Sequence, residues 1–323
     1  MRVRAFAKIN LSLRVIGTRE DGYHELRTIF QSIALHDTLT IRASRGPFRL
    51  TCDDSACPAD DTNLMARAAA RLWTASGRRG APRDVAIDLL KRIPLQAGLG
   101  GGSSDAAATL RALARRWRVG GARVRATAAA LGADVPYFLE GGTVLGLDRG
   151  DLLFPLIDPP AAWVVLVLPN FGVSTKDAFG WLDGDGAQGS QPVDADGARG
   201  SRPSVSRSPE RLALQHKRLA LQHTGLARQR GLALQAGSAR AELINDLEAP
   251  VVARHPEIGR IISALRRQGA FQAAMSGSGS AVFGLFPLRR DAVRAAKELA
   301  SASRRTLVTR TLNRPKYQTL AAT

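Results

Sequence analysis

The sequence contains few cysteines and no long apolar run. Its two cysteines, Cys52 and Cys57, provide neither a disulfide framework nor a zinc-binding spacing supported by nearby histidines. The best apolar stretch, residues 161–169, is far shorter than the roughly 18 residues of a membrane span, and it predicts a buried strand. Residues 1–13 contain charges and no continuous apolar core, so they do not resemble a signal peptide. We therefore expect a cytoplasmic protein.

Aromatic residues are also scarce, and the basic residues are not gathered into blocks. Aromatic side chains make up 5% of the 323 residues, which leaves few rings to stack on bases, and the sequence contains no RNA-binding signature. The formal net charge is nevertheless +18. A surface this basic suits nucleic acids and also anionic small molecules, so charge alone leaves both classes of partner open.

The chain is long enough for two domains and carries both strand and helix patterns. Alternating apolar residues over 3–13 predict a strand, and a polar loop follows at 18–24. The spacing over 63–76 predicts a helix with Asn63 as its N-cap, and the alternation over 85–89 predicts another strand. The remaining patterns predict helices over 104–117, 245–269 and 291–303, and strands within 270–286 and over 306–312. Helices packed on antiparallel strands indicate an α+β fold.

Residues 184–240 differ in composition from the rest of the chain. This stretch is rich in Gly, Ser, Pro and Asp, and it contains the near-identical heptapeptides RLALQHK (211–217) and RLALQHT (218–224). We interpret it as a recently duplicated surface insertion, partly disordered. The alternative is a short amphipathic helix.

The most informative stretch is PLQAGLGGGSSDAA, residues 94–107, between a predicted strand and a predicted helix. A P-loop requires a lysine after its last glycine, and none is present here. A dinucleotide fingerprint requires glycine at the sixth position from Gly98, where Ser103 stands, and it normally opens the first strand–helix–strand unit. Backbone N–H groups and a helix dipole can still hold phosphate at such a junction. We therefore predict a phosphate cradle of a third type, while a helix-capping turn without ligand stays open for this segment alone.

Six segments carry a resemblance to a known family. They are AKINLSL (7–13), DGYHELRTIFQSI (21–33), PLQAGLGGGSSDAA (94–107), LGADVPYFL (131–139), STKDAF (174–179) and MSGSGSAVF (275–283). In this order they resemble the GHMP small-molecule kinases. The first two, together with GADVP, resemble more narrowly the kinases of 4-diphosphocytidyl-2-C-methyl-D-erythritol in the non-mevalonate isoprenoid pathway. The resemblance covers nearly the whole chain except the insertion.

The resemblance implies a two-domain GHMP kinase fold of the α+β class. We expect an N-terminal ribosomal-S5-like α/β domain over residues 1–158, and a C-terminal ferredoxin-like α+β domain over residues 159–323 that carries the 184–240 insertion. The last strand, residues 306–318, is expected to return to the N-terminal domain.

The resemblance also implies the reaction, an ATP-dependent phosphorylation of the substrate's 2-hydroxyl group. It makes Asp134 the acceptor of the hydroxyl proton and Lys8 the group that orients this carboxylate and the γ-phosphoryl group. It assigns ATP binding to Pro94, Leu95, Gln96, Ala97, Gly98, Leu99, Gly100, Gly101, Gly102, Ser103 and Ser104. It assigns substrate binding to Asn10, Tyr23, His24, Thr175 and Phe179, with Tyr23 and Phe179 as a stacking pair and His24 recognising cytosine. Mg²⁺ is expected with ATP, although no acidic cluster in the sequence identifies its ligands.

Two departures from the family pattern stand out. Gln96 and Ala97 occupy positions where members often have small residues or glycine, and LDRGDLL (147–153) replaces a Gly-x-Gly-Glu hairpin, with Asp151 in the acidic position. The expected partners are the cytidine substrate and ATP, without nucleic acid or membrane, in a monomer or homodimer. The alternatives are a homoserine, mevalonate or sugar kinase of the same superfamily, and an RNA-binding protein with an S5-like fold.

Overall fold

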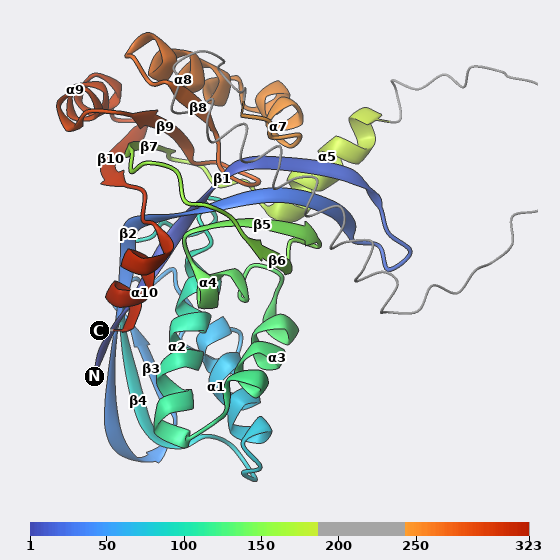
Figure 1. Cartoon of the computed structure of the whole chain (residues 1–323), viewed down its shortest axis with the longest axis vertical. Helices are drawn as coiled ribbons and strands as arrows, with labels where there is room; N and C mark the ends of the chain where they lie inside the picture. The colour runs from blue at the N-terminus through green and yellow to red at the C-terminus, as the bar shows by residue number, and fades with distance from the viewer. Residues whose placement is uncertain (187–242, 323) are drawn as a thin grey trace, which may run out of the picture.

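The computed structural model describes residues 1–186 and 243–322, which form two β-sheets with helices packed on each (Figure 1). This mixed architecture confirms the predicted α+β class. The first three residues of the predicted insertion at 184–240 end a helix. The rest of the insertion, with both heptapeptides, lies outside the described residues.

The first sheet is built around one very long strand. Its strands are β1 (Arg2–Thr18), β2 (His24–Pro47), β3 (Arg49–Cys52), β4 (Arg83–Leu90), β5 (Thr143–Asp148) and β6 (Leu152–Pro155). Along one edge β2 pairs with β1; along the other, residues 26–31 pair with β5 and residues 38–43 with β4. Among the described strands β1 therefore pairs with β2 alone, and its second edge is available to loops.

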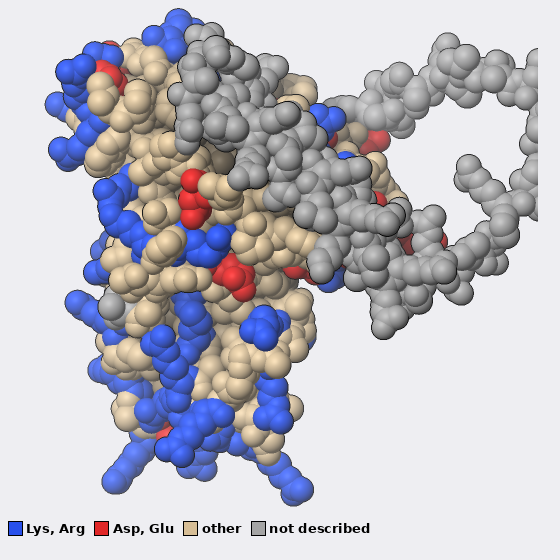
Figure 2. Space-filling view, viewed as in Figure 1, with Lys and Arg blue, Asp and Glu red and all other residues tan. Residues whose placement is uncertain are grey.

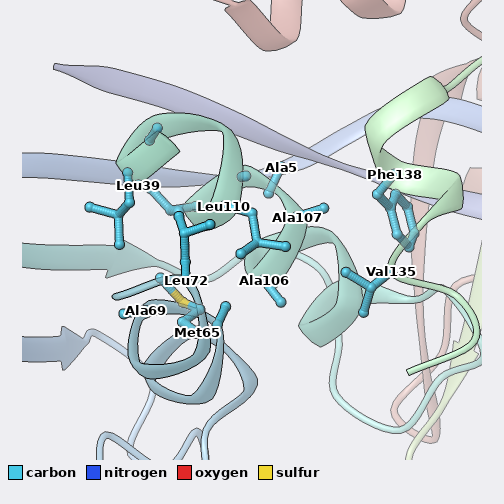
Figure 3. Packing of buried hydrophobic residues seen from close by; sticks show 14 of the residues in the cluster. Ala5, Leu39, Met65, Ala69, Leu72, Ala106, Ala107, Leu110, Val135 and Phe138 are labelled. Atoms are coloured by element: carbon cyan, nitrogen blue, oxygen red, sulfur yellow. The ribbon is translucent and has the colours of Figure 1, made fainter. Parts of the chain in front are cut away.

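Helices cover one face of this sheet. They are α1 (Leu64–Ala75), α2 (Gly101–Trp117), α3 (Gly121–Leu131) and the single turn α4 (Tyr137–Glu140). Side chains of α1 and α2 gather with Leu39 of β2 in one hydrophobic core (Figure 3). The fully buried alanines 106–108 explain how α2 fits into this core, because small side chains allow close approach to the sheet.

Local sequence accounts for the start of both long helices. The side chain of Asn63 accepts a hydrogen bond from the Met65 N–H at 2.8 Å, which confirms the predicted N-cap of α1. The helix predicted over 104–117 begins three residues earlier, at Gly101, because Gly100 adopts a left-handed conformation (φ +70°) and ends the loop there. Gly101 and Gly102 therefore belong to the first turn of α2.

The second sheet lies at the other end of the molecule. Its strands are β7 (Trp163–Pro169), β8 (Gln272–Met275), β9 (Val282–Phe286) and β10 (Arg304–Arg310), all antiparallel in the order β10-β7-β9-β8. The helices near it are α5 (Thr175–Gly186), α7 (Glu248–Arg254), α8 (Pro256–Arg267) and α9 (Arg289–Leu299) (Figure 1). Alternate β7 residues enter two different cores, Val165 on one face and Val164 on the other. Burial on both faces explains the continuous apolar run at 161–169.

A third core joins the two sheets. Ala7 and Ile9 of β1 pack there with Leu166 of β7, and Ala97 and Leu99 of the glycine-rich stretch belong to the same cluster. The residues that flank Gly98 are thus anchored in apolar packing. This anchoring fixes the position of the loop between the sheets.

The C-terminal segment differs from the predicted strand over 306–318. β10 ends at Arg310 and pairs with β7 in the second sheet; after it, Thr311 bridges to Ile33 and the Leu312 N–H donates to the Ser32 carbonyl in the first sheet. The chain then forms helix α10 (Arg314–Ala322), whose Tyr317 is buried against Phe6 of β1. Helical packing of Tyr317 therefore takes the place of strand pairing.

Candidate active site

A cleft of about 1020 Å³ lies between the two sheets and collects nearly all the predicted site residues. Its lining contains Lys8, Asn10, Tyr23, His24, Pro94, Leu95, Gln96, Ala97, Gly98, Leu99, Gly100, Gly101, Gly102, Ser103, Asp134, Thr175 and Phe179. These residues come from β1, β2, the loop before α2, the turn after α3 and helix α5.

Ser104 is the predicted ATP-binding residue that the cleft does not include. Its side chain is fully buried, and its hydroxyl donates a hydrogen bond to the Phe6 carbonyl at 2.7 Å. The extra helical turn at the start of α2 is the reason, because it turns Ser104 toward β1 while Ser103 faces the cleft.

Lys8 and Asp134 meet in the cleft although 125 positions separate them in the sequence. The Lys8 Nζ lies 3.7 Å from an Asp134 carboxylate oxygen. Lys8 is 5% exposed, whereas the Asp134 side chain is 35% exposed and faces the open cleft. Burial lowers the pKa of Lys8, and the attraction of Asp134 offsets this only in part. The carboxylate is thus the more accessible of the two groups.

A chain of hydrogen bonds fixes Lys8. Its Nζ donates to the Asn10 side-chain oxygen at 2.6 Å, and the Asn10 amide donates to the Thr28 hydroxyl at 2.7 Å. That hydroxyl in turn donates to the Ser12 carbonyl at 2.8 Å. Because Lys8 and Asn10 are two apart on β1, their side chains share one face, as the sequence predicts.

The start of α2 presents backbone donors to the same cleft. The first intrahelical bond runs from the Ser104 N–H to the Gly100 carbonyl, which leaves the N–H groups of residues 101–103 without such a partner. No side chain caps this end of the helix. Free N–H groups and the positive end of a 17-residue helix form a site suited to an anion.

The glycine-rich stretch is closed against a second glycine turn, residues 276–280. A Cβ atom on Gly98 would lie 2.0 Å from the Ser276 carbonyl oxygen, and Gly98 has φ +71°. The Ser276 hydroxyl donates to the Gly98 carbonyl at 3.1 Å, and the Ala281 N–H donates to the Ala97 carbonyl at 3.3 Å. The two turns, one from each sheet, therefore hold each other in place.

Three buried ionisable side chains connect α2 to the first sheet. Lys91 Nζ lies 2.5 Å from Asp37 and 2.8 Å from Asp105. Asp37 also accepts hydrogen bonds from two backbone N–H groups, whereas one oxygen of Asp105 is buried without a partner. Burial, followed by the charge of Asp37, raises the pKa of Asp105 to about 8 against the attraction of Lys91. Asp37 is therefore the better hydrogen-bonded of the two carboxyl groups beside Lys91.

This arrangement predicts a pH-dependent stability. The pKa of Asp105 is about 8 in the folded protein, and its ordinary value is 3.8. The protonated carboxyl therefore stabilises the fold fully below about pH 4, and this stabilisation is lost as the pH rises to about 8. Urea unfolding should therefore show Asp105→Asn gaining stability relative to the wild type between about pH 4 and 8, and no further above it. A difference that stays constant with pH would contradict the assignment.

Aromatic rings and polar groups form the other end of the cleft. The rings of His24 and Phe179 stack with their centroids 4.5 Å apart, and Tyr23 is 59% exposed. His24 Nε2 lies 2.9 Å from Asp183, and the hydroxyl of Thr175 lies 3.1 Å from that of Ser278. Phe179 thus contacts His24 directly, and both Tyr23 and Phe179, which are expected to stack on the cytidine, line this end of the cleft.

The cleft also contains residues that were not predicted, and Asp183 and Arg149 are two charged residues among them. Asp183 on α5 faces His24, and nothing in its sequence context distinguishes it from other acidic residues. Arg149 lies with its guanidinium 5.4 Å from the Tyr23 ring centroid and pairs with Asp151 at 2.7 Å. The departure at 147–153 drew attention to Asp151, but the side chain that reaches the cleft from this hairpin is Arg149.

The described residues include no group of three or more His, Cys, Asp or Glu side chains placed to hold a metal ion. Among the helices of residues 1–186 and 243–322, none has the length and apolar character needed to cross a membrane.

Known proteins resemble this chain along most of its length. Residues 63–142 match the family described as GHMP kinases N terminal domain, and residues 222–304 match GHMP kinases C terminal. A 4-diphosphocytidyl-2-C-methyl-D-erythritol kinase of Moorella thermoacetica is 40% identical over 311 residues, which covers 95% of this chain and 98% of the relative. A kinase of the same name from Heliobacterium modesticaldum is 37% identical over 322 residues, covering 97% and 96%.

Solved structures agree with this relationship. A 4-(cytidine 5'-diphospho)-2C-methyl-D-erythritol kinase superposes with a TM-score of 0.70 at 33% identity, covering 96% of this chain and 99% of that one. The homoserine kinase of Cytophaga hutchinsonii has a TM-score of 0.62 at 17% identity, covering 97% and 95%, which shows a common fold only. The resemblance seen in the six sequence segments is confirmed. The chain belongs to the 4-diphosphocytidyl-2-C-methyl-D-erythritol kinase family of the GHMP kinases.

Proposed function

We propose that this protein transfers the γ-phosphoryl group of ATP to the 2-hydroxyl group of 4-diphosphocytidyl-2-C-methyl-D-erythritol. The observation that carries the proposal is the Lys8–Asp134 pair, which lies in the same cleft as the uncapped start of α2. An ammonium, an accessible carboxylate and a set of backbone donors are the groups that phosphoryl transfer to an alcohol requires.

Asp134 acts as the proton acceptor. The substrate hydroxyl gives its proton to the Asp134 carboxylate while its oxygen forms a bond to the γ-phosphorus, and the bond between this phosphorus and the β,γ-bridging oxygen breaks to release ADP. Lys8 stays next to both groups, held by Asn10. Its charge attracts the Asp134 carboxylate and balances the negative charge that develops on the transferred phosphoryl group.

The start of α2 binds the triphosphate of ATP. The N–H groups of residues 101–103 donate to phosphate oxygens, and glycines at 100–102 leave no side chain between them and the ligand. Ser103 is the hydroxyl on this side of the helix that lines the cleft. Ser104 contributes indirectly, through its bond to the Phe6 carbonyl, which ties α2 to β1.

Mg²⁺ neutralises phosphate charge when it is bound with ATP. The donor set fits a metal held mainly by phosphate oxygens and water, since the described residues contain no carboxylate cluster. Asp134 is the carboxylate of the cleft that lies beside the phosphoryl end, so it is the protein group that would contact the ion.

The cytidine end of the substrate binds among the aromatic residues. Tyr23 and Phe179 provide ring faces, and His24, oriented by Asp183, provides a hydrogen-bonding edge. Since Phe179 stacks on His24, the base either lies between Tyr23 and His24 or displaces Phe179. Thr175 adds a hydroxyl at the side of this pocket.

The two sheets divide this work. Strands β1–β6 all precede residue 159 and supply Lys8 and Asn10, while β7–β10 all follow it. We keep 1–158 as the catalytic and ATP-binding domain and 159–323 as the second domain, which contributes Thr175 and Phe179.

A coupled assay tests the substrate. The protein should consume ATP with 4-diphosphocytidyl-2-C-methyl-D-erythritol in the presence of Mg²⁺, and should show far lower kcat/KM with homoserine or mevalonate. Turnover with one of those alcohols and none with the cytidine substrate would instead favour the alternative GHMP kinases. ATP-independent, salt-sensitive RNA binding without turnover would favour the RNA-binding alternative.

Removal of the Tyr23 ring tests the cytidine site. Tyr23→Ala should raise the KM for the cytidine substrate about 5- to 100-fold with little change in kcat, because a stacked base is worth about 1–3 kcal/mol. Phe271→Ala removes another exposed ring, 41% exposed and outside the cleft, and should leave KM unchanged. An unchanged KM in Tyr23→Ala would argue against stacking on this residue.

A further inference from the structure

A second pocket, of about 320 Å³, lies between α2, α3 and α4 and shares no lining residue with the catalytic cleft. Three arginines line it: Arg111 and Arg115 from α2, and Arg125 from α3. Figure 2 shows that Lys and Arg side chains dominate the lower half of this face, over α2 and α3, with very few Asp or Glu side chains among them.

The charges of these arginines are not balanced. Within residues 1–186 and 243–322, none of the three guanidinium groups forms an ion pair. Arg111 donates to the Phe138 carbonyl and its guanidinium lies 5.9 Å from the Tyr317 ring centroid, but its Nε and Nη2 are buried without a hydrogen-bond partner among the described residues. In the same part of the chain, Arg115 donates to the Ala322 carbonyl at 3.2 Å. Glu140 is the single carboxylate of the lining.

The start of α3 adds to the positive potential. A Cβ atom on Gly121 would lie 3.4 Å from a terminal nitrogen of Arg125, so this guanidinium sits over the first turn of the helix. The N-cap, Gly120, has no side chain to bond the free N–H groups. A cation is unfavourable at the positive end of a helix dipole. An anion between Arg125 and this end would be attracted by both.

We propose that this pocket binds a small phosphorylated anion through Arg111, Arg115 and Arg125. Phosphate suits it because a guanidinium group bonds phosphate oxygens in pairs, and three arginines line this pocket. The volume admits a phosphate or diphosphate group with a short organic part, and besides Glu140 and Gly121 the remaining lining is apolar: Ala114, Val119, Val124 and Leu139. Such a pocket suits one compact ligand better than a polymer.

Calorimetric titration of inorganic pyrophosphate into the full-length protein tests the proposal. A saturating non-hydrolysable ATP analogue occupies the catalytic cleft, and constant ionic strength near about 0.15 M screens non-specific attraction. One pyrophosphate should bind, and R115Q/R125Q should weaken it at least about tenfold, because each charge-assisted bond contributes strongly to affinity. R71Q/R123Q removes the same charge from exposed arginines of α1 and α3 outside the pocket, and should bind as the wild type does.

Circular dichroism should give both double variants the wild-type melting temperature within a few degrees, so a loss of binding would not reflect unfolding. Equal affinity in R115Q/R125Q and the wild type, or no pyrophosphate binding to the wild type, would overturn the proposal. So would binding of an RNA oligomer that depends on Arg115 and Arg125 when pyrophosphate does not bind. The test is independent of the cytidine-substrate assay, and each can fail alone.

Discussion

Asp134→Asn is expected to lower kcat about 10²- to 10⁴-fold while the dissociation constant of ATP changes little. Asparagine keeps the shape of the side chain but cannot accept the hydroxyl proton. The expected loss in kcat is the usual size of a general-base contribution. The N–H donors of the ATP site belong to the start of α2 and not to Asp134, so binding of the nucleotide measured without Mg²⁺ should persist. Single-turnover kinetics and titration with an ATP analogue measure the two quantities separately.

The same substitution should change Lys8. Its pKa is already lowered by burial, and Asp134 is the carboxylate that opposes this effect. Loss of the carboxylate lowers the Lys8 pKa further below its ordinary value of 10.5. As the pH rises, the residual activity of the variant should therefore fall at a lower pH than the activity of the wild type does. Asp88→Asn, at an exposed ion pair outside the cleft, is the matched control. Wild-type kcat in Asp134→Asn would rule out its role as the proton acceptor.

Gly98→Ala should be severely damaging although it adds a single methyl group. The new Cβ would lie 2.0 Å from the Ser276 carbonyl oxygen, which is backbone and cannot rotate away, at a φ of +71° that L-residues rarely adopt. Left-handed strain and overpacking together should lower the free energy of unfolding by about 2–5 kcal/mol. Displacement of the loop should lower kcat/KM for ATP about 100-fold.

Gly17→Ala provides the comparison for that experiment. A Cβ at Gly17 would meet no atom within 4 Å, and its φ lies outside the left-handed range. Urea unfolding of this variant should match the wild type within about 0.5 kcal/mol. If Gly98→Ala unfolded at the same urea concentration as Gly17→Ala, the contact between the two glycine turns would not be as tight as described.

The elements of the fold were largely predictable because their signals are local. The N-cap Asn63, the apolar alternation of 85–89 and the two-sided burial of 161–169 depend on neighbours along the chain, and each prediction is confirmed. The start of α2 at Gly101 was missed because the composition of glycines and serines does not reveal where the left-handed residue stands. Helix α10, which follows β10, was missed because it depends on the tertiary packing that buries Tyr317.

The site was predictable only through whole motifs. No period or spacing brings Lys8 to Asp134, since their contact depends on how β1 and the turn after α3 meet in three dimensions. Asp183 and Arg149 lie outside the motifs, and their positions follow from the packing of α5 and of the β5–β6 hairpin. Ser104 is the opposite case: it lies inside a motif, but the helix turns it away from the cleft.

The contact between Gly98 and Ser276 has a consequence for building chimeras from divergent relatives. The segments that meet here come from opposite halves of the chain, and they touch mainly through main-chain atoms. Halves from two parents should therefore assemble into a working enzyme even when their surfaces have drifted far apart, provided that each parent keeps a glycine or another small residue at its side of the seam. A parent with a larger residue at the position of Gly98 or Ser276 would prevent this contact from forming in every hybrid made from it.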